Sequence, residues 1–182
     1  MNAFDFPVGT CLLALLGVAA GTDLHARRIP NVLVLTGLAV AFAVQWALHG
    51  VGEGSQRWMS GLLTGGCLFM PFYLLRGMGA GDVKLMAAVG AFVGAGPAFE
   101  IALATCVIGG VWSLAVVVFK GAARSVATNM MAILLSKGGQ GGRLFESEKG
   151  AAMPSVGSLP YGVAIAMGTL SIMLLRAGQS IA

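Results

Sequence analysis

The sequence predicts an all-α integral membrane protein with about six transmembrane helices. Of its 182 residues, 57% are hydrophobic and only 10% are charged, and the mean hydropathy is +0.87. Soluble domains average about 45–50% apolar and about 25% charged residues, so this composition indicates a chain that is largely solvated by lipid. Six apolar runs are long enough to cross about 30 Å of hydrocarbon. They cover residues 6–22, 31–49, 58–75, 83–99, 101–119 and 158–175.

The first apolar run predicts a helix that the protein retains. Asp5 precedes it and no Lys or Arg lies among residues 1–10, whereas Arg27 and Arg28 follow it. A cleaved signal peptide carries its basic residues before the apolar run, so the polarity here is reversed.

Glycines mark the expected contacts between helices. The 28 glycines show no fixed period and lie mostly within the apolar runs, where small residues let transmembrane helices approach closely. The fourth run, 83–99, contains Gly90, Gly94, Gly96 and Pro97. We therefore expect this helix to be short or broken near its end.

The basic residues predict how the chain is oriented. Six spans leave seven hydrophilic pieces on alternating sides, and only Arg57 and Arg176 fall on one of those sides. The other side holds the remaining nine of the eleven: Arg27, Arg28, Arg76, Lys84, Lys120, Arg124, Lys137, Arg143 and Lys149. By the positive-inside rule this second side is cytoplasmic, so both termini lie outside. The net charge of +4 therefore reflects topology, and we expect no nucleic-acid partner.

The longest connection, 120–157, lies on the cytoplasmic side. Residues 125–135 are apolar enough for a short interfacial helix but too few to span, and the GGQGG segment at 138–142 is typical of a flexible linker. No second domain fits into this connection. We therefore expect residues 1–182 to form a single polytopic domain.

Two acidic residues are candidates for function. Asp23 lies where the first helix reaches the cytoplasmic face and Asp82 where the fourth helix leaves it, so both lie at one depth. Acids near the hydrocarbon boundary cost on the order of a few kcal/mol to keep, which favours a functional role. The simpler alternatives are a helix N-cap for Asp82 and, for Asp23, a solvated helix end balanced by Arg27 or Arg28.

The segments around the two acids are distinctive. Gly77, Gly79 and Gly81 alternate directly before Asp82, which gives a backbone that can adopt positive φ and that an extended peptide could approach closely. On the other segment, Pro30 and Asn31 predict a turn followed by the start of a helix.

A pair of facing carboxyls predicts hydrolytic chemistry. Two acids that cannot easily both ionise share a proton, so that one acts as a general base on water while the other polarises a carbonyl. This chemistry needs no cofactor, and we expect neither a cofactor nor a metal. Cys11, Cys67 and Cys106 form no CxxC motif and have no nearby His pair, and the sequence contains neither GxSxG nor HExxH.

On these residues the sequence resembles the type IV prepilin peptidase family, the GxGD aspartyl proteases of the bacterial inner membrane. The resemblance rests on GAGDVK at 79–84, on Asp23 followed by RIPN at 28–31, and on LPYG at 159–162. It is greatest to the short branch that processes Flp-type, tight-adherence pilin precursors. The cytoplasmic CxxC domain that accompanies methylation in the long branch is missing, so methyltransferase activity is not expected.

The resemblance implies that Asp23 and Asp82 are the catalytic dyad and that the substrate is a prepilin. Its short basic leader would be cut at the cytoplasmic face, while its apolar helix would lie among the helices of the enzyme and the membrane lipids. Both termini would then be periplasmic. The same motifs imply roles in substrate binding or loop geometry for Gly77, Gly79, Gly81, Lys84, Pro30, Asn31, Pro160, Tyr161 and Gly162.

Simpler roles compete at some of these positions. Lys84 could pair with an ionised Asp82 or extend toward lipid phosphates, and we favour the second. Pro160 suits the first turn of the last helix, so Pro160 and Gly162 are expected to shape that helix rather than react.

Two other functions remain open. The chain could be a small proton-coupled transporter that uses the acids as a relay, or a non-catalytic membrane scaffold of a pilus or secretion apparatus. A relay favours ionisable residues distributed through the bilayer, whereas both candidate acids lie at one face, which favours the protease. The sequence does not predict an oligomeric state.

Overall fold

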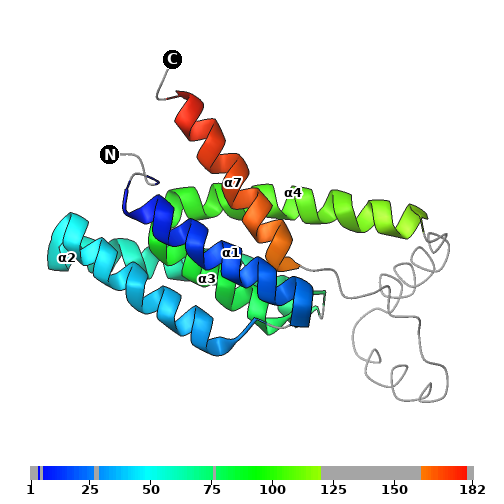
Figure 1. Ribbon diagram of the computed structural model, residues 1–182, viewed down its shortest axis with the longest axis horizontal. Helices are drawn as coiled ribbons and strands as arrows, with labels where there is room; N and C mark the ends of the chain where they lie inside the picture. Colours follow the sequence, from blue (N-terminus) through cyan, green and yellow to red (C-terminus); the bar gives the residue numbers. More distant parts are fainter. Residues whose placement is uncertain (1–3, 5, 27–28, 76, 120–160, 180–182) are drawn as a thin grey trace. The chain divides into compact units, whose positions relative to one another are not determined.

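The computed structural model describes residues 4, 6–26, 29–75, 77–119 and 161–179 (Figure 1). Within these ranges every regular element is an α-helix: α1 (Val8–Ala26), α2 (Asn31–Leu74), α3 (Ala80–Val93), α4 (Ala95–Phe119) and α7 (Tyr161–Gln179). Contacts group residues 1–109 and 160–182 into one compact unit, the main unit, and residues 110–159 into another. The predicted interfacial helix at 125–135 lies outside the described residues.

Among the described residues, four helices are long and apolar enough to cross a membrane: α1, α2, α4 over Ala95–Ala115, and α7. Their outward surfaces are apolar, as the exposed side chains of Leu35, Leu63 and Leu174 illustrate. Large apolar groups on the outside are expected where the surrounding solvent is lipid. The chain is therefore an all-α membrane protein, which confirms the predicted fold class at this level.

The second and third predicted spans, 31–49 and 58–75, belong to one interrupted helix, α2. Gly50 interrupts it with φ 76° and ψ 174°, a backbone conformation that glycine adopts without a steric penalty. The residues that follow Gly50 are again helical. The connection expected at 50–57 is thus a single-residue break instead of a loop.

The two arms of α2 fold back on each other, and we call them the α2 hairpin (Figure 1). Gly54 packs against Gln45, where an added Cβ would lie only 2.5 Å from the carbonyl oxygen of Gln45. Further along, the indole Nε1 of Trp58 donates a hydrogen bond of 3.1 Å to the carbonyl oxygen of Leu38. Contacts between residues on both sides of Gly50 show that the arms run side by side.

The break between α3 and α4 lies earlier than the sequence suggested. We expected spans at 83–99 and 101–119, but α3 ends at Val93 because Gly94 adopts φ 82°, and α4 begins at Ala95. Pro97 therefore stands in the first turn of α4, where an N–H has no partner within the helix and its absence costs little. The expected short fourth helix is confirmed: 14 residues at about 1.5 Å each extend about 21 Å.

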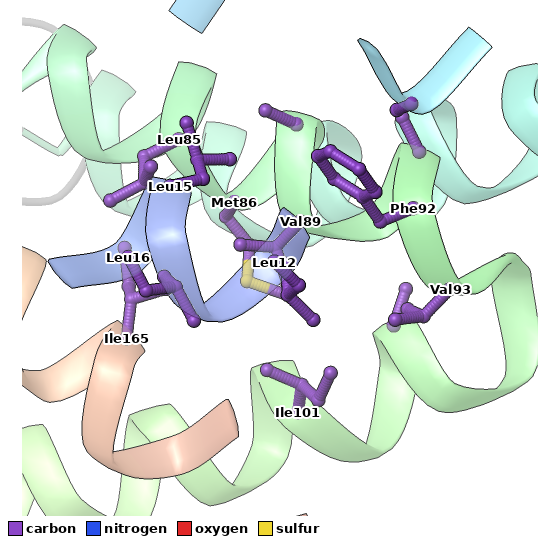
Figure 2. Close-up of a cluster of buried hydrophobic side chains, with 14 of the residues drawn as sticks. Leu12, Leu15, Leu16, Leu85, Met86, Val89, Phe92, Val93, Ile101 and Ile165 are labelled. Atoms are coloured by element: carbon purple, nitrogen blue, oxygen red, sulfur yellow. The ribbon is translucent and has the colours of Figure 1, made fainter. Parts of the chain in front are cut away.

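Helix α3 is enclosed by the other helices of the main unit. It packs mainly against α2 and also contacts α1 and α7. Leu85, Met86 and Val89 of α3 are fully buried. Figure 2 shows Met86 and Val89 next to Leu12 of α1, and Leu85 next to Leu15 of the same helix. Because α3 is covered on nearly all sides, the residues that it carries at its start are held in a defined place.

Backbone-to-backbone packing joins the second arm of the α2 hairpin to α3. A Cβ added at Gly61 would lie 2.0 Å from the carbonyl oxygen of Gly90, and one added at Gly65 would lie 2.3 Å from that of Met86. Helices approach this closely only where a side chain is missing. The expectation that the glycines form helix-packing surfaces is confirmed at these positions.

Within the main unit, an ion pair links the end of α7 to the start of α4. Nη2 of Arg176 lies 2.7 Å from Oε1 of Glu100, and the guanidinium also lies over the ring of Phe4, 5.9 Å from its centroid. Arg176 is near the end of α7 and Glu100 near the start of α4. The two helices are therefore antiparallel neighbours.

Candidate active site

Asp23 lies in the last turn of α1 and is buried, with 7% of its surface exposed. Its Oδ2 accepts a hydrogen bond of 2.8 Å from the backbone N–H of Gly162. Gly162 is the second residue of α7, so this N–H belongs to the unpaired amides at the start of that helix. The structure therefore does not leave Asp23 as a solvated helix end.

Asp82 lies in the first turn of α3, and its side chain turns back toward the preceding loop. Its Oδ2 accepts a hydrogen bond of 3.1 Å from the backbone N–H of Gly79, the N-cap residue. Because Gly79 has no side chain, only this half of a capping box is formed. Asp82 is thus not the helix N-cap considered as the simpler alternative, because α3 begins at Ala80 and its N-cap is Gly79. Its carboxylate bonds the N–H of that N-cap residue through Oδ2, and the other carboxylate oxygen is free of this interaction.

The two acids lie close enough to influence each other. Asp82 precedes the apolar part of α3, and burial raises the pKa of its carboxyl to about 6. The N–H of Gly79 acts in the opposite direction, while the negative charge of Asp23 raises the pKa further. Asp23 and Asp82, which belong to helices distant in the sequence, therefore interact electrostatically.

The start of α7 completes the surroundings of the acids. Besides the N–H that Gly162 donates to Asp23, the phenol of Tyr161 interacts electrostatically with Asp82. The ring of Tyr161 packs on α4, where a Cβ added at Gly109 would lie 3.4 Å from its Cε1. Tyr161 and Gly162 thus interact with the acids, and Pro160 lies outside the described residues.

Lys84 and Asn31 make a contact that the sequence did not suggest. Nζ of Lys84 donates a hydrogen bond of 3.0 Å to Oδ1 of Asn31. Neither role considered for Lys84 describes this contact, and Lys84 forms no ion pair with any residue in the described ranges. A comparison of the predicted helix ends could have found it, because Asn31 begins one predicted span and Lys84 lies at the start of another. Asn31 also begins α2 directly after Pro30, as predicted.

The glycines before Asp82 do not have the conformation that we expected. Gly77, Gly79 and Gly81 all lack a positive φ; Gly79, for example, has φ −77° and ψ 150°. That expectation is wrong because the segment leads directly into α3, which begins at Ala80. Gly81 is nevertheless crowded: an added Cβ would lie 3.3 Å from Cβ of Ile29, a neighbour that the sequence did not predict.

Comparison with known proteins supports membership in the family that the sequence motifs resemble. A sequence model of the type IV leader peptidase family matches residues 10–114, which include both acids and more than half of the chain. No curated protein and no solved structure gave a match. With a family match over these residues, and with a buried acid at the end of α1 that interacts with a partly exposed acid at the start of α3, this chain belongs to the type IV leader peptidase family.

Proposed function

We propose that this protein is a membrane aspartic endopeptidase that removes the leader peptide of Flp-type prepilins at the cytoplasmic face of the bacterial inner membrane. Asp23 and Asp82 are its catalytic pair. One observation carries the proposal: a buried Asp23 lies close enough to Asp82 for its charge to raise the pKa of that carboxyl. A family match that spans both acids supports it.

The surroundings of the acids support different roles for them. Oδ2 of Asp23 faces an N–H at the start of α7, where the helix dipole and a charge-assisted hydrogen bond stabilise an anion. Burial raises the pKa of Asp82 to about 6, so its carboxyl holds a proton up to a higher pH than an exposed aspartate does. In the proposed mechanism Asp23 is the general base and Asp82 the general acid.

The reaction then proceeds through a tetrahedral intermediate. Asp23 takes a proton from a water molecule, whose oxygen attacks the carbonyl carbon of the scissile peptide, while Asp82 donates its proton to the carbonyl oxygen. In the second step Asp82 takes a hydroxyl proton back and Asp23 gives its proton to the leaving nitrogen, and the C–N bond breaks. Both acids return to their starting states, and one water is consumed for each bond cleaved.

The proposed topology has six spans, with both termini in the periplasm and the acids at the cytoplasmic ends of their helices. The directions of the helices support it, because α1 ends near Asp23 whereas α3 and α7 begin near Asp82 and Tyr161. The Arg176–Glu100 ion pair joins the end of α7, away from Tyr161, to the start of α4. In this proposal residues 1–182 act as one domain in which the prepilin helix lies among the helices and lipid.

Substitution of each acid tests the proposal. Asp23→Asn and Asp82→Asn keep the size of the side chain, so both variants should reach the membrane in normal amounts and leave a co-expressed Flp-type prepilin uncut. Glu100→Gln is the matched control. Glu100 lies near the start of α4, away from the place where Tyr161 packs on that helix, and among the described residues it pairs only with Arg176. If either Asp variant at normal abundance still shortens the prepilin, the dyad is wrong. Cleavage that stops when a metal chelator is added would also contradict two-carboxyl chemistry.

A further inference from the structure

Ile29 and Asn31, which follow the end of α1, are joined to the start of α3 by an apolar contact and a polar contact. The polar contact is the 3.0 Å hydrogen bond from Nζ of Lys84 to Oδ1 of Asn31. The apolar contact brings the side chain of Ile29 against Gly81, where an added Cβ would lie 3.3 Å away. Gly81 and Lys84 flank Asp82 in the sequence, so the contacts hold the chain on both sides of that acid.

Neither partner of the polar contact gains local stabilisation from its own helix. Lys84 lies near the start of α3, whose positive dipole end repels a cation. Asn31 is the first residue of α2, one position after the N-cap Pro30, and α2 has no side-chain cap. Its oxygen accepts the Lys84 proton instead. Neither helix gains locally from this arrangement, so the reason for it lies in the contact between segments.

We propose that Lys84 and Asn31 are positioning residues that hold the Asp23 segment against the start of α3 and so keep the two carboxyls face to face. This inference rests on the proposed function of Asp23 and Asp82. Asp23 is also held on its other side by the N–H of Gly162. Loss of the Lys84–Asn31 contact would therefore leave the end of α1 attached to α7 but less firmly held against the start of α3.

The kinetic test removes each partner separately and together. Lys84→Met and Asn31→Leu keep similar side-chain sizes but remove the donor or the acceptor, and each should lower kcat for prepilin cleavage by about tenfold or more with little change in KM. Misplacement of reacting groups by about 1 Å can cost about 100-fold. The double variant should be no slower than Lys84→Met alone, because both changes break one contact. Lys84→Arg keeps a donor and should recover most of the lost rate.

Arg57→Met is the matched control for removal of a basic residue, because Arg57 is exposed and lies on the second arm of the α2 hairpin. Thermal unfolding of each variant shows whether it is folded. A Lys84→Met variant that cleaves within twofold of the Arg57→Met control would overturn the proposal. Additive losses in the double variant would overturn it as well.

A second measurement reports position without activity. In a background with Cys11, Cys67 and Cys106 replaced by Ala, Asp23→Cys and Asp82→Cys introduce two thiols that a short bis-maleimide can link. Lys84→Met and Asn31→Leu should each lower the yield of the cross-link, whereas Arg57→Met should not. If the yield stays the same while kcat falls, Lys84 acts other than by positioning and the inference is wrong. The cross-link does not depend on activity, so it still tests the positioning role if Asp23→Asn or Asp82→Asn proves active. Failure of the proposed function can therefore be distinguished from failure of this inference.

Discussion

Asp23 and Gly162 are 139 residues apart, yet the Asp23 carboxylate accepts a 2.8 Å hydrogen bond from the backbone N–H of Gly162. The contact ties the end of α1 to the start of α7 in a buried position. It also gives a reason for glycine at 162, because an added Cβ would lie 2.8 Å from Oδ2 of Asp23 and 3.1 Å from its Cβ.

Replacement of Gly162 should therefore disable the site without removing either acid. In Gly162→Ala the new methyl group pushes the Asp23 carboxylate out of place, and we expect prepilin cleavage to fall by about 10- to 100-fold. Gly178→Ala, on the same helix, is the control, because no atom lies within 4 Å of a Cβ added there. Cleavage assays at matched membrane abundance compare the two variants. Equal activity would mean that the Gly162 contact does not position Asp23.

The rate of cleavage should depend on pH through Asp82. The proposed mechanism needs a protonated Asp82, whose pKa is raised to about 6. As pH rises through about 6 this proton is lost, so kcat/KM should fall and approach roughly a tenfold decrease per pH unit well above 6. A pH–rate profile of the purified protein measures this. A kcat/KM that still rises between pH 6 and 8 would contradict the assignment of Asp82 as the acid.

The stability of the fold should also depend on pH through Asp82, and the contribution of Asp82 should decrease as pH rises. Because the folded-state pKa of Asp82 is raised from 3.8 to about 6, the folded protein binds more protons than the unfolded chain in this interval. The free energy of unfolding contributed by Asp82 therefore decreases as pH rises through this range. Asp82→Asn removes the cost of the buried charge and should raise Tm at pH 7.5, by about 2–4 °C for each kcal/mol.

The difference in Tm between Asp82→Asn and the parent should vanish below about pH 3, about one unit under the unfolded pKa of 3.8, where the parent Asp82 is protonated in both the folded and the unfolded state. Differential scanning fluorimetry at both pH values measures it. Because Asp82 is partly exposed, solvent screening reduces the effect. A lower Tm of the Asn variant at pH 7.5 would show that the Asp82 charge stabilises the fold.

Packing between the α2 hairpin and α3 should tolerate no side chain at Gly61. In Gly61→Ala the added Cβ would lie 2.0 Å from the carbonyl oxygen of Gly90, so the helices must separate. We expect a loss in the free energy of unfolding on the order of 1–3 kcal/mol. Gly66→Ala is the control, since its Cβ would make an ordinary 3.5 Å contact with Ala87. Thermal unfolding in detergent that ranks the two variants alike would refute this account of the interface.

A larger side chain at Gly81 should inactivate the protein while it still inserts into the membrane. A Cβ at this position lies 3.3 Å from Cβ of Ile29, and the branched side chain of Gly81→Val adds further atoms next to Asp82. Gly21→Val carries the same change near Asp23, at a position with no atom within 4 Å of a Cβ. Cleavage by membranes that contain equal amounts of each variant gives the comparison. Full activity of Gly81→Val would remove the claim of a close approach at this position.

The sequence by itself determined the class of the protein, the approximate helices and the two acids. These features are local: long apolar runs and the distribution of charge predict which segments are helical and which ends share a membrane face. The same local features predict that Asp23 and Asp82 lie at one depth. They predict the chain less accurately at 50–57 and 83–99, because the breaks depend on the left-handed backbone at Gly50 and Gly94, and the surrounding glycines offered several equally suitable positions.

Only the tertiary structure decided how the acids are held. The bonds from Gly162 to Asp23 and from Lys84 to Asn31 join residues 139 and 53 positions apart, and local patterns do not specify such pairings. They arise because α3 packs against α2 and also contacts α1 and α7, which brings the starts of α2, α3 and α7 to the end of α1. Side-chain partners follow from that packing, since a polar group near the hydrocarbon must find its hydrogen bond among the neighbours that the fold supplies.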